Sequence, residues 1–324
     1  MSAANPMTGP MISPTNPTAV LLMAYGTPAS PADIEAYYTD IRRGRPPSPE
    51  QLADLTARYD AIGGTSPLAA VTEAQRVALQ AALHREAPGE FVVVQGLKHA
   101  EPKIEVAVEA LAAQGCEHVI GLVLAPHYSA YSVGQYLDRA RAAAEPHDIT
   151  VTGVQSWATE PAFVQFVAAD LKAKLANMPT DTRVVFTAHS LPQRIIAGGD
   201  PYPAELTSTA EAVAAELGRS GAKIDWTIAW QSAGRTPEPW LGPDILEVID
   251  DIAAGGDPGD AQRGILVSAV GFVADHLEVL YDLDIEAAAR AAGHGVAFAR
   301  TKCVNDDPTV MTALAHRVIA KARG

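Results

Sequence analysis

Two stretches of the chain carry side chains that could accept protons and bind a metal ion. His189 lies in the segment Ala188-His189-Ser190-Leu191-Pro192, and Glu278 ends the segment at residues 271–278, which reads GFVADHLE. Each segment follows an apolar run typical of a buried strand, so both side chains are expected at the carboxyl ends of strands in parallel sheets. An imidazole and a carboxylate placed in this way favour metal chemistry in a cleft.

Acidic residues recur after Glu278 at every fourth position. Asp282 and Glu286 continue the series, and residues four apart lie on one side of a helix. The series predicts that a cation passes along these carboxylates. The alternative interpretation is an ordinary acidic helix face exposed to solvent. An ideal α-helix would fan the three carboxylates over roughly 80°, so a locally wider turn would align them better. His276, two residues before Glu278, is expected to point elsewhere.

Apolar runs and the helical patterns between them predict the fold. Eight runs typical of strands cover residues 19–24, 91–97, 118–125, 149–155, 183–187, 226–230, 264–270 and 296–299. Helical periodicity is clearest over residues 104–113, 161–175, 205–217 and 308–322. This alternation predicts an α/β protein. An eight-stranded barrel is disfavoured because roughly 65 residues separate the first two runs, which is long for one crossover.

We therefore expect two doubly wound, Rossmann-like domains whose parallel sheets face a central cleft. Residues 19–156 would form the first domain and residues 157–306 the second, while residues 307–324 would form a helix that packs back on the first. Residues 1–18 are expected to be a mobile tail, and the Gly/Pro stretch at 254–259 a surface loop.

Composition narrows the class of protein. The 324 residues are 48% apolar, and 38 acidic against 24 basic residues give a net charge of −14, which disfavours nucleic acid and anionic membranes as partners. The longest apolar runs fall short of the roughly 20 residues that span a bilayer. No secretory signal pattern is recognised at the start. Cys116 and Cys303 are the two cysteines, which fits a reducing cytoplasm.

Seven segments, in order from about residue 19 to the C-terminus, closely resemble ferrochelatase, and more narrowly its soluble coproporphyrin III branch. They are residues 23–28 (MAYGTP), 37–44 (YYTDIRRG), 58–68 (RYDAIGGTSPL), 188–192 (AHSLP), 231–234 (QSAG), 239–243 (PWLGP) and 271–278 (GFVADHLE). The resemblance implies two Rossmann-like domains around a porphyrin, and insertion of ferrous iron into coproporphyrin III with release of two protons. The expected product is the iron complex, an intermediate of haem biosynthesis.

The resemblance also implies roles for individual residues. His189 and Glu278 would be catalytic and would contact the metal. The acidic series itself adds Asp282 and Glu286 as candidate metal-binding residues, for passage of the metal or of protons. Porphyrin-binding residues would be Tyr25, Arg42, Arg58, Tyr59, Ser66 and Tyr136, with Tyr25 on the face opposite His189. Guanidinium groups bind carboxylates such as propionates in a bidentate manner. Arg43 and Arg45 are expected to be surface charges, and His99 and His127 structural, hydrogen-bonded histidines. A π-type helix is implied after Glu278.

Fe²⁺ is expected as a substrate rather than a permanently bound cofactor. Two cysteines cannot supply the four ligands of the [2Fe-2S] cluster that some relatives carry, so no cluster is expected. The expected partners are the porphyrin and Fe²⁺, with a transient contact to the next enzyme of haem biosynthesis, and neither nucleic acid nor a stable membrane association. A cytoplasmic monomer is expected.

Three alternative functions stay open. The chain could act on protoporphyrin IX, it could insert cobalt or nickel into a tetrapyrrole, or it could be a non-catalytic porphyrin carrier. The presence of both His189 and Glu278 disfavours the carrier, which needs one axial ligand and contacts to propionates. Cobalt-inserting relatives usually have a pair of histidines, so Glu278 disfavours cobalt.

Overall fold

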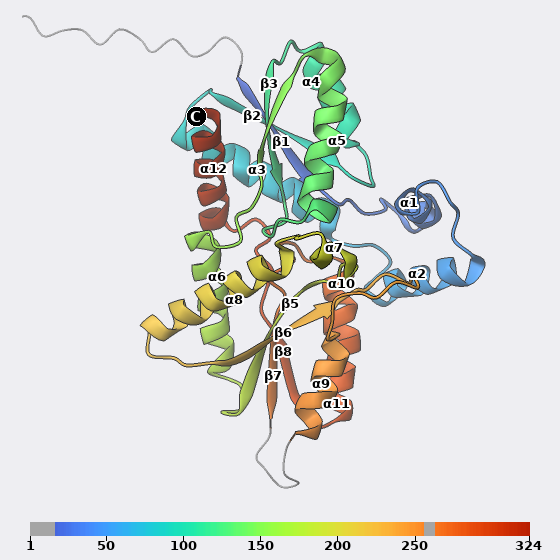
Figure 1. Ribbon diagram of the computed structural model, residues 1–324, viewed down its shortest axis with the longest axis vertical. Coiled ribbons are helices and arrows are strands. Elements are labelled where there is room, and N and C mark those ends of the chain that lie inside the picture. The colour runs from blue at the N-terminus through green and yellow to red at the C-terminus, as the bar shows by residue number, and fades with distance from the viewer. Residues whose placement is uncertain (1–16, 256–262) are drawn as a thin grey trace, which may run out of the picture.

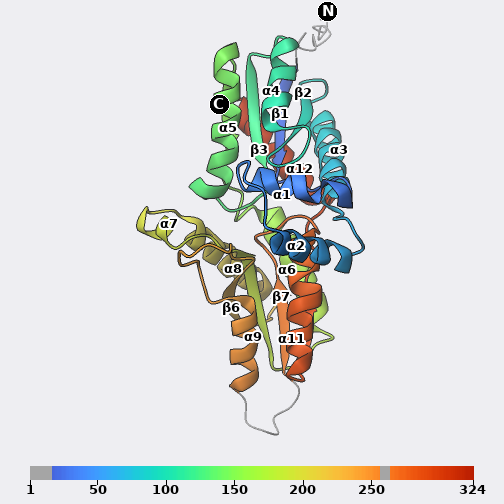
Figure 2. The same ribbon diagram turned by 90° about the vertical axis from the view of Figure 1, so that its right-hand side faces the viewer.

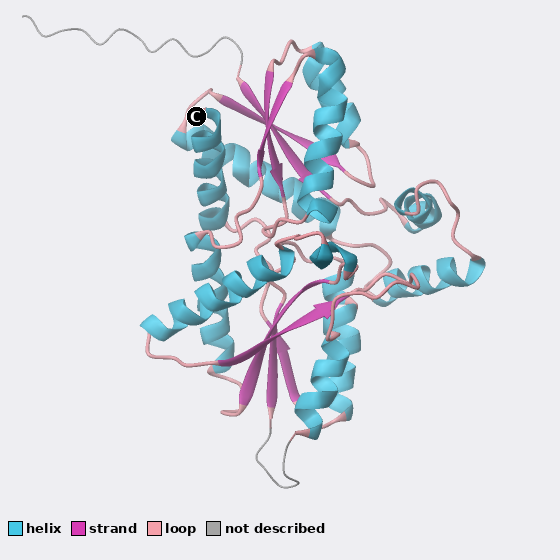
Figure 3. Cartoon of the chain, viewed as in Figure 1, coloured by secondary structure: helices cyan, strands magenta, loops and turns pink. Residues whose placement is uncertain are grey.

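The computed structural model describes residues 17–255 and 263–324, and it contains two four-stranded parallel sheets, drawn as the upper and lower sets of arrows in Figure 3. The predicted tail lies almost wholly outside these residues, and so does most of the predicted loop at 254–259. The first sheet has the order β2-β1-β3-β4 and the second has the order β6-β5-β7-β8. The strands are β1 (Thr18–Ala24), β2 (Phe91–Leu97), β3 (His118–Val123), β4 (Thr150–Val154), β5 (Thr182–His189), β6 (Asp225–Gln231), β7 (Gly264–Ser268) and β8 (Ala297–Arg300).

The predicted α/β class with two doubly wound sheets is confirmed. All eight predicted strands are present, and their ends differ from the predicted ones by no more than two residues. The segments that hold β1–β4 and β5–β8 are called the first half and the second half below. The α-helices are α1 (Ile34–Ile41), α2 (Pro49–Ala61), α3 (Leu68–Glu86), α4 (Ile104–Ala113), α5 (Gln135–Ala144), α6 (Pro161–Leu175), α7 (Arg194–Ala197), α8 (Tyr202–Arg219), α9 (Ile245–Ala254), α10 (Leu277–Leu280), α11 (Ala288–Gly293) and α12 (Pro308–Ala322).

Four short segments have other helical forms. Two are 3₁₀ turns, η1 (Pro31–Asp33) and η3 (Glu145–His147). The other two are π-helical, η2 (Ala130–Gly134) and η4 (Asp282–Ala287). Across the described residues, none of the helices combines the length and the apolar character needed to span a bilayer.

Strand β1 shows why the first sheet is covered on both faces. Its side chains alternate between two buried clusters, because successive residues of a strand point to opposite faces. Leu21 and Met23 pack with residues of α4 and α5, while Val20 and Leu22 pack with residues of α3 and α12. A strand that is apolar at every position therefore lies between two layers of helices, as expected for a parallel sheet.

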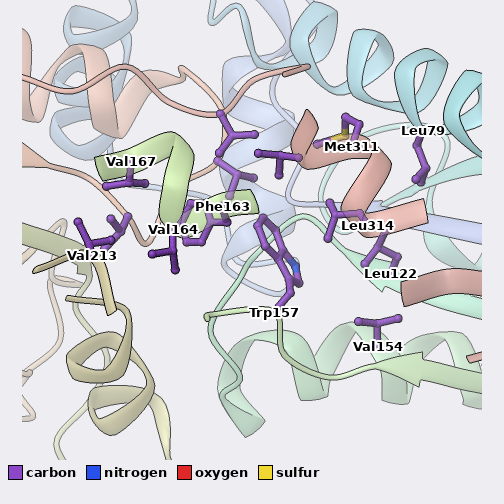
Figure 4. Packing of buried hydrophobic residues seen from close by; sticks show 14 of the residues in the cluster. Leu79, Leu122, Val154, Trp157, Phe163, Val164, Val167, Val213, Met311 and Leu314 are labelled. Atoms are coloured by element: carbon purple, nitrogen blue, oxygen red, sulfur yellow. The ribbon is translucent and has the colours of Figure 1, made fainter. Parts of the chain in front are cut away.

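A shared core fixes the two halves relative to each other. One buried cluster contains Leu122 of the first sheet and Leu314 of α12, both labelled in Figure 4, together with Phe186 of the second sheet. Trp157, which lies between the halves in sequence, is 1% exposed in this cluster, and its indole N–H donates to the carbonyl of Val123 at 3.2 Å. Helix α12 packs against α3, so the end of the chain returns to the first half.

The carboxyl ends of both sets of strands point toward the junction between the halves, and α1 and α2 lie at the same level (Figures 1 and 2). Helix α2 starts at a capping box in which the Ser48 hydroxyl accepts from the Gln51 N–H while the Gln51 side chain accepts from the Ser48 N–H. Pro49 at the first helical position suits this start. The cap fixes the beginning of the helix that carries Arg58 and Tyr59.

Candidate active site

His189 is the last residue of β5, and its ring is set as a proton acceptor. Its Nδ1–H donates to the carbonyl of Ser190. A carbonyl oxygen can only accept, so the neutral form of the ring has its proton on Nδ1 and its lone pair on Nε2. Nε2 lies 3.7 Å from Oε1 of Glu278, and the His189 side chain is 36% exposed. Nε2 thus faces a carboxylate at a position that solvent reaches.

Glu278 lies in the first turn of α10 and is held as a carboxylate. Burial alone raises the pKa of its carboxyl, but the facing His189, followed by His276 and Ser232, outweighs burial and lowers the pKa to about 2. The side chain is 33% exposed. Glu278 is therefore negatively charged at neutral pH and can stabilise a positive charge that develops on His189.

A glycine lets the segment after β7 pass beside His189. A Cβ atom at Gly271 would lie 2.6 Å from the Cα of Ala188, which is closer than real contacts allow. The Gly271 N–H donates to the carbonyl of Thr187 at 3.0 Å. At the other side, the Gln231 amide at the end of β6 donates to the carbonyl of Glu278 at 2.9 Å. These contacts join β5, β6 and β7 around the His189–Glu278 pair.

The acidic series does not lie on one regular α-helix. Helix α10 is followed by the π-helical segment η4 and then by α11. Within η4 the N–H of Glu286 donates to the carbonyl of Tyr281, five residues earlier, at 2.9 Å. Such single-turn π segments are frequent at functional sites. The wider turn that the resemblance implied is present.

Asp282 is buried between the two halves, whereas Glu286 is exposed. Asp282 is 6% exposed and accepts from the Ser232 hydroxyl, and its Oδ1 lies 3.4 Å from a guanidinium nitrogen of Arg58. Burial and then the negative charge of Glu278 raise the pKa of Asp282 to about 6. Glu286 lines a shallow surface pocket with Arg290 and His294. The series thus runs from half-exposed Glu278 through buried Asp282 to the surface.

Three predicted porphyrin-binding tyrosines come from the first half. Tyr25 follows β1 and is 40% exposed, whereas Tyr59 and Tyr136 are 2% and 5% exposed. Burial is the largest cause that raises the pKa of each of the three hydroxyls, and the negative charge of Glu278 raises each pKa further. The tyrosines therefore stay neutral and lie within electrostatic range of the carboxylate in the second half.

The predicted edge residues Arg58, Arg42 and Ser66 have different surroundings. Arg58 reaches across to Asp282 and stacks 4.9 Å from the ring centre of Tyr281. Arg42 instead donates to the carbonyl of Arg45 at 3.2 Å, and the Ser66 hydroxyl accepts from the Leu68 N–H at 3.2 Å. The structure brings Arg58 to the acidic series, and it leaves Arg42 and Ser66 in contact with their sequence neighbours. Arg43 and Arg45 are exposed, as predicted.

The expectation that His276 points elsewhere was wrong. His276 has an extended backbone with φ −158° and ψ −177° because α10 begins only at the next residue. Its Nδ1–H donates to the carbonyl of Ala274 at 3.0 Å, and its Nε2 lies 3.8 Å from Oε2 of Glu278. Glu278 therefore has an imidazole near each carboxylate oxygen.

The two histidines expected to be structural are hydrogen-bonded. His99 lies 2.7 Å from a carboxylate oxygen of Asp40, and His127 lies 2.9 Å from the Thr209 hydroxyl. Burial lowers the pKa of His99 to about 4 and that of His127 to about 3. Both are therefore neutral at physiological pH.

Two further residues of the site were given no role from the sequence. The Tyr202 hydroxyl donates to the carbonyl of His189 at 3.2 Å. The Lys98 ammonium, directly after β2, lies 6.0 Å from the ring centre of Tyr25. The position of Lys98 at a strand end was visible in the sequence, but its contacts depend on the packing of α5. In the described part of the chain, no three His, Cys, Asp or Glu side chains converge as a ready-made metal site.

Comparisons with known proteins agree with this geometry. A family model described as Ferrochelatase matches residues 17–322. The coproporphyrin III ferrochelatase of Geobacillus kaustophilus is 44% identical over 311 residues, which cover 93% of this chain and 95% of that protein. The ferrochelatase of Herpetosiphon aurantiacus is 43% identical over 303 residues, or 92% of this chain and 96% of that one. A solved structure of SirB from Bacillus subtilis with Fe3+ has a TM-score of 0.56 at 16% identity, covering 95% of this chain and 96% of that one, which indicates a shared fold.

Proposed function

The chain belongs to the ferrochelatase family, and from this premise we propose that it inserts Fe²⁺ into coproporphyrin III in haem biosynthesis. The porphyrin loses its two inner N–H protons, Fe²⁺ loses its water ligands, and four ring nitrogens bind the metal. The charges balance, because the dication replaces two protons. Relatives that match over nearly the whole chain and are named for coproporphyrin III support this choice of porphyrin.

The observation that carries the proposal is the 3.7 Å separation between His189 Nε2 and Glu278 Oε1. Because Nδ1 donates to Ser190, Nε2 is the atom that can take a proton from a pyrrole N–H. The imidazolium then formed lies next to a carboxylate that is already ionised, and this stabilises the transition state for proton removal. A porphyrin carrier has no need of such a pair.

The acidic series suits the delivery of iron. Glu278, Asp282 and Glu286 offer carboxylate oxygens along α10 and η4, from the residue that faces His189 to an exposed position. Carboxylates are suitable ligands for a divalent ion that is losing water. In this proposal Glu286 meets hydrated Fe²⁺ first, and Glu278 holds it next to the ring.

Contacts to the porphyrin edge are proposed for Arg42, Arg58, Tyr59, Ser66 and Tyr136, and contact with one face of the ring for Tyr25. Arg58 has a second partner, since it lies 3.4 Å from Asp282. A propionate that binds Arg58 would share the guanidinium with Asp282 or displace that carboxylate. In either case, binding of the porphyrin changes the surroundings of Asp282, the middle residue of the acidic series.

Further properties belong to the same proposal. Fe²⁺ is a substrate, and the protein holds no permanent cofactor and no [2Fe-2S] cluster. Cys116 and Cys303 are both free thiols, in keeping with a cytoplasmic location. We propose a monomer that meets the next enzyme of the pathway transiently and binds neither nucleic acid nor membranes stably.

An anaerobic assay tests the proposal. The protein is mixed with Fe²⁺ and coproporphyrin III, and visible spectra are recorded as the free-base bands convert to those of the iron complex. Parallel reactions contain protoporphyrin IX with Fe²⁺, or coproporphyrin III with Co²⁺ or Ni²⁺. Turnover that is fastest with Fe²⁺ and coproporphyrin III supports the proposal. Binding of the porphyrin without turnover under any of these conditions would make the chain a carrier and overturn it.

A further inference from the structure

Lys98 is a half-buried cation without a carboxylate partner. It directly follows β2, and its ammonium donates to Oε1 of Gln135 at 2.8 Å. Within residues 17–255 and 263–324 no Asp or Glu forms an ion pair with it. An ammonium group has three donors, so the Gln135 contact leaves others unused. Removing a charge from water without pairing it is costly, which makes this position suited to an anionic ligand.

The neighbouring cations are paired, in contrast to Lys98. Lys103, at the start of α4, lies 3.0 Å from a carboxylate oxygen of Asp40. Arg139 forms a bidentate ion pair with Glu105 through contacts of 2.7 and 2.8 Å. The carboxylates of this region are thus used by other cations. Burial and then the charges of Arg139 and Arg43 lower the pKa of Lys98 to about 8, so a nearby anion would relieve an unfavourable environment.

The position of the ammonium suggests where that anion belongs. The Lys98 Nζ lies 6.0 Å from the ring centre of Tyr25 and 5.1 Å from that of Tyr136. Tyr25 is the tyrosine proposed to face the porphyrin, and Tyr136 is proposed to contact its edge. A porphyrin that meets both tyrosines would have its periphery within reach of a lysine side chain, which is long and flexible.

We propose that Lys98 binds a peripheral carboxylate of the porphyrin and thereby selects for rings that carry more carboxylates. This inference rests on the proposed function and adds a specificity-determining residue to it. Coproporphyrin III has four propionates and protoporphyrin IX has two. A cation that is separate from Arg42 and Arg58 gives one of the additional propionates a charge-assisted partner.

The test compares Lys98→Met and Lys98→Arg with the parent protein. Metal-free binding of coproporphyrin III is followed by porphyrin fluorescence, and turnover is measured with Fe²⁺. We expect Lys98→Met to raise both Kd and KM about tenfold or more with kcat within about twofold, because a charge-assisted hydrogen bond is lost. Lys98→Arg should retain most of the affinity. The ratio of kcat/KM for coproporphyrin III over protoporphyrin IX should fall in Lys98→Met.

Lys103→Met is the matched control, since this lysine follows the same strand but is paired with Asp40. It should leave Kd and the ratio between the porphyrins unchanged. Lys98→Gln provides a second test in case Lys98→Met does not fold. The thermal unfolding midpoint of each protein shows whether it is folded. A Kd within twofold of the parent in folded Lys98→Met or Lys98→Gln would overturn the inference, as would an equal loss of affinity for both porphyrins. The binding measurement needs no turnover, so it tests the role of Lys98 independently of the proposed reaction. The reaction itself is tested with the parent protein.

Discussion

Nε2 of His189 and Oε1 of Glu278 lie 3.7 Å apart, although His189 ends β5, Glu278 lies in α10, and most of the second half separates them in the sequence. The hydrogen bond from Nδ1 to Ser190 fixes the tautomer of the neutral ring, so Nε2 is the nitrogen that can accept a proton. The pair is therefore a base next to a fixed negative charge. This relationship separates the two roles, with His189 taking the proton and Glu278 stabilising the charge that results.

His189→Ala should keep the fold and the affinity for porphyrin but nearly abolish metal insertion. Removal of a general base typically lowers the rate by about 10²- to 10⁴-fold. The ring is 36% exposed, so its loss leaves no buried cavity and should change the thermal unfolding midpoint little. The measurement is single-turnover insertion of Fe²⁺ at saturating coproporphyrin III, with fluorescence titration as the control for binding. Turnover close to that of the parent would remove His189 from the mechanism.

Glu278→Gln and Glu286→Gln should have different kinetic effects. Glu278 is next to His189, so its neutral analogue should lower kcat at every iron concentration. Glu286 is exposed in the surface pocket, so Glu286→Gln should raise the KM for Fe²⁺ and leave kcat largely unchanged. Steady-state rates over a range of Fe²⁺ concentrations distinguish the two. Equal losses of kcat in both variants would contradict the division between reaction and delivery.

How far the sequence predicts this site depends on the range of the interaction. The uninterrupted apolar character of β1 and the periodicity of residues 161–175 are local properties, and they predicted the two sheets and helix α6. The pairing of Arg58 with Asp282 could not be predicted, because it depends on how α2 in the first half packs against η4 in the second. The place of His276 could not be predicted either, because it depends on an extended backbone at the residue just before α10.

Acid should destabilise the protein partly through His127. This imidazole is 2% exposed, and burial lowers its pKa to about 3 in the folded state. The unfolded chain has an ordinary histidine with a pKa of about 6.5, so below that pH the unfolded state binds a proton that the folded state rejects. The contribution of His127 to the free energy of unfolding is complete above pH ~6.5 and is lost as the pH falls toward ~3. Between pH 7 and 5 the loss is up to about 2 kcal/mol.

Urea unfolding of the parent and His127→Gln at both pH values measures this effect. Glutamine can still donate to Thr209, so the variant should fold, but it should lose less stability between pH 7 and 5 than the parent. His99 acts in the same direction and remains in both proteins, so the difference between them reports His127. An identical pH dependence in the two proteins would show that His127 is not the group concerned.

We also expect the purified protein to lack iron–sulfur absorbance and the variant with Cys116→Ser and Cys303→Ser to remain active. Cluster ligation by cysteine needs four thiolates. Cys303 is buried, and burial raises the pKa of its thiol, so it stays protonated. Visible spectra and iron and sulfide analysis of anaerobically purified protein provide the measurement. A cluster-loaded protein that loses colour and activity in the double variant would contradict this prediction.

Coproporphyrin III should be a clearly better substrate than protoporphyrin IX, and Arg42→Ala should weaken that preference. Arg42 lies 5.6 Å over the ring of Tyr38, with no carboxylate partner in the described residues, so its guanidinium can bind a propionate without breaking an ion pair. One or two additional charge-assisted contacts could change kcat/KM about tenfold or more. The comparison requires both porphyrins to be monomeric in detergent, because aggregation of the less soluble protoporphyrin IX would imitate selectivity. Arg43→Ala, at an exposed neighbour, is the matched control and should leave the ratio unchanged. If protoporphyrin IX proves equal or better under these conditions, the choice of coproporphyrin III is wrong, whereas membership of the ferrochelatase family stands on the match to residues 17–322.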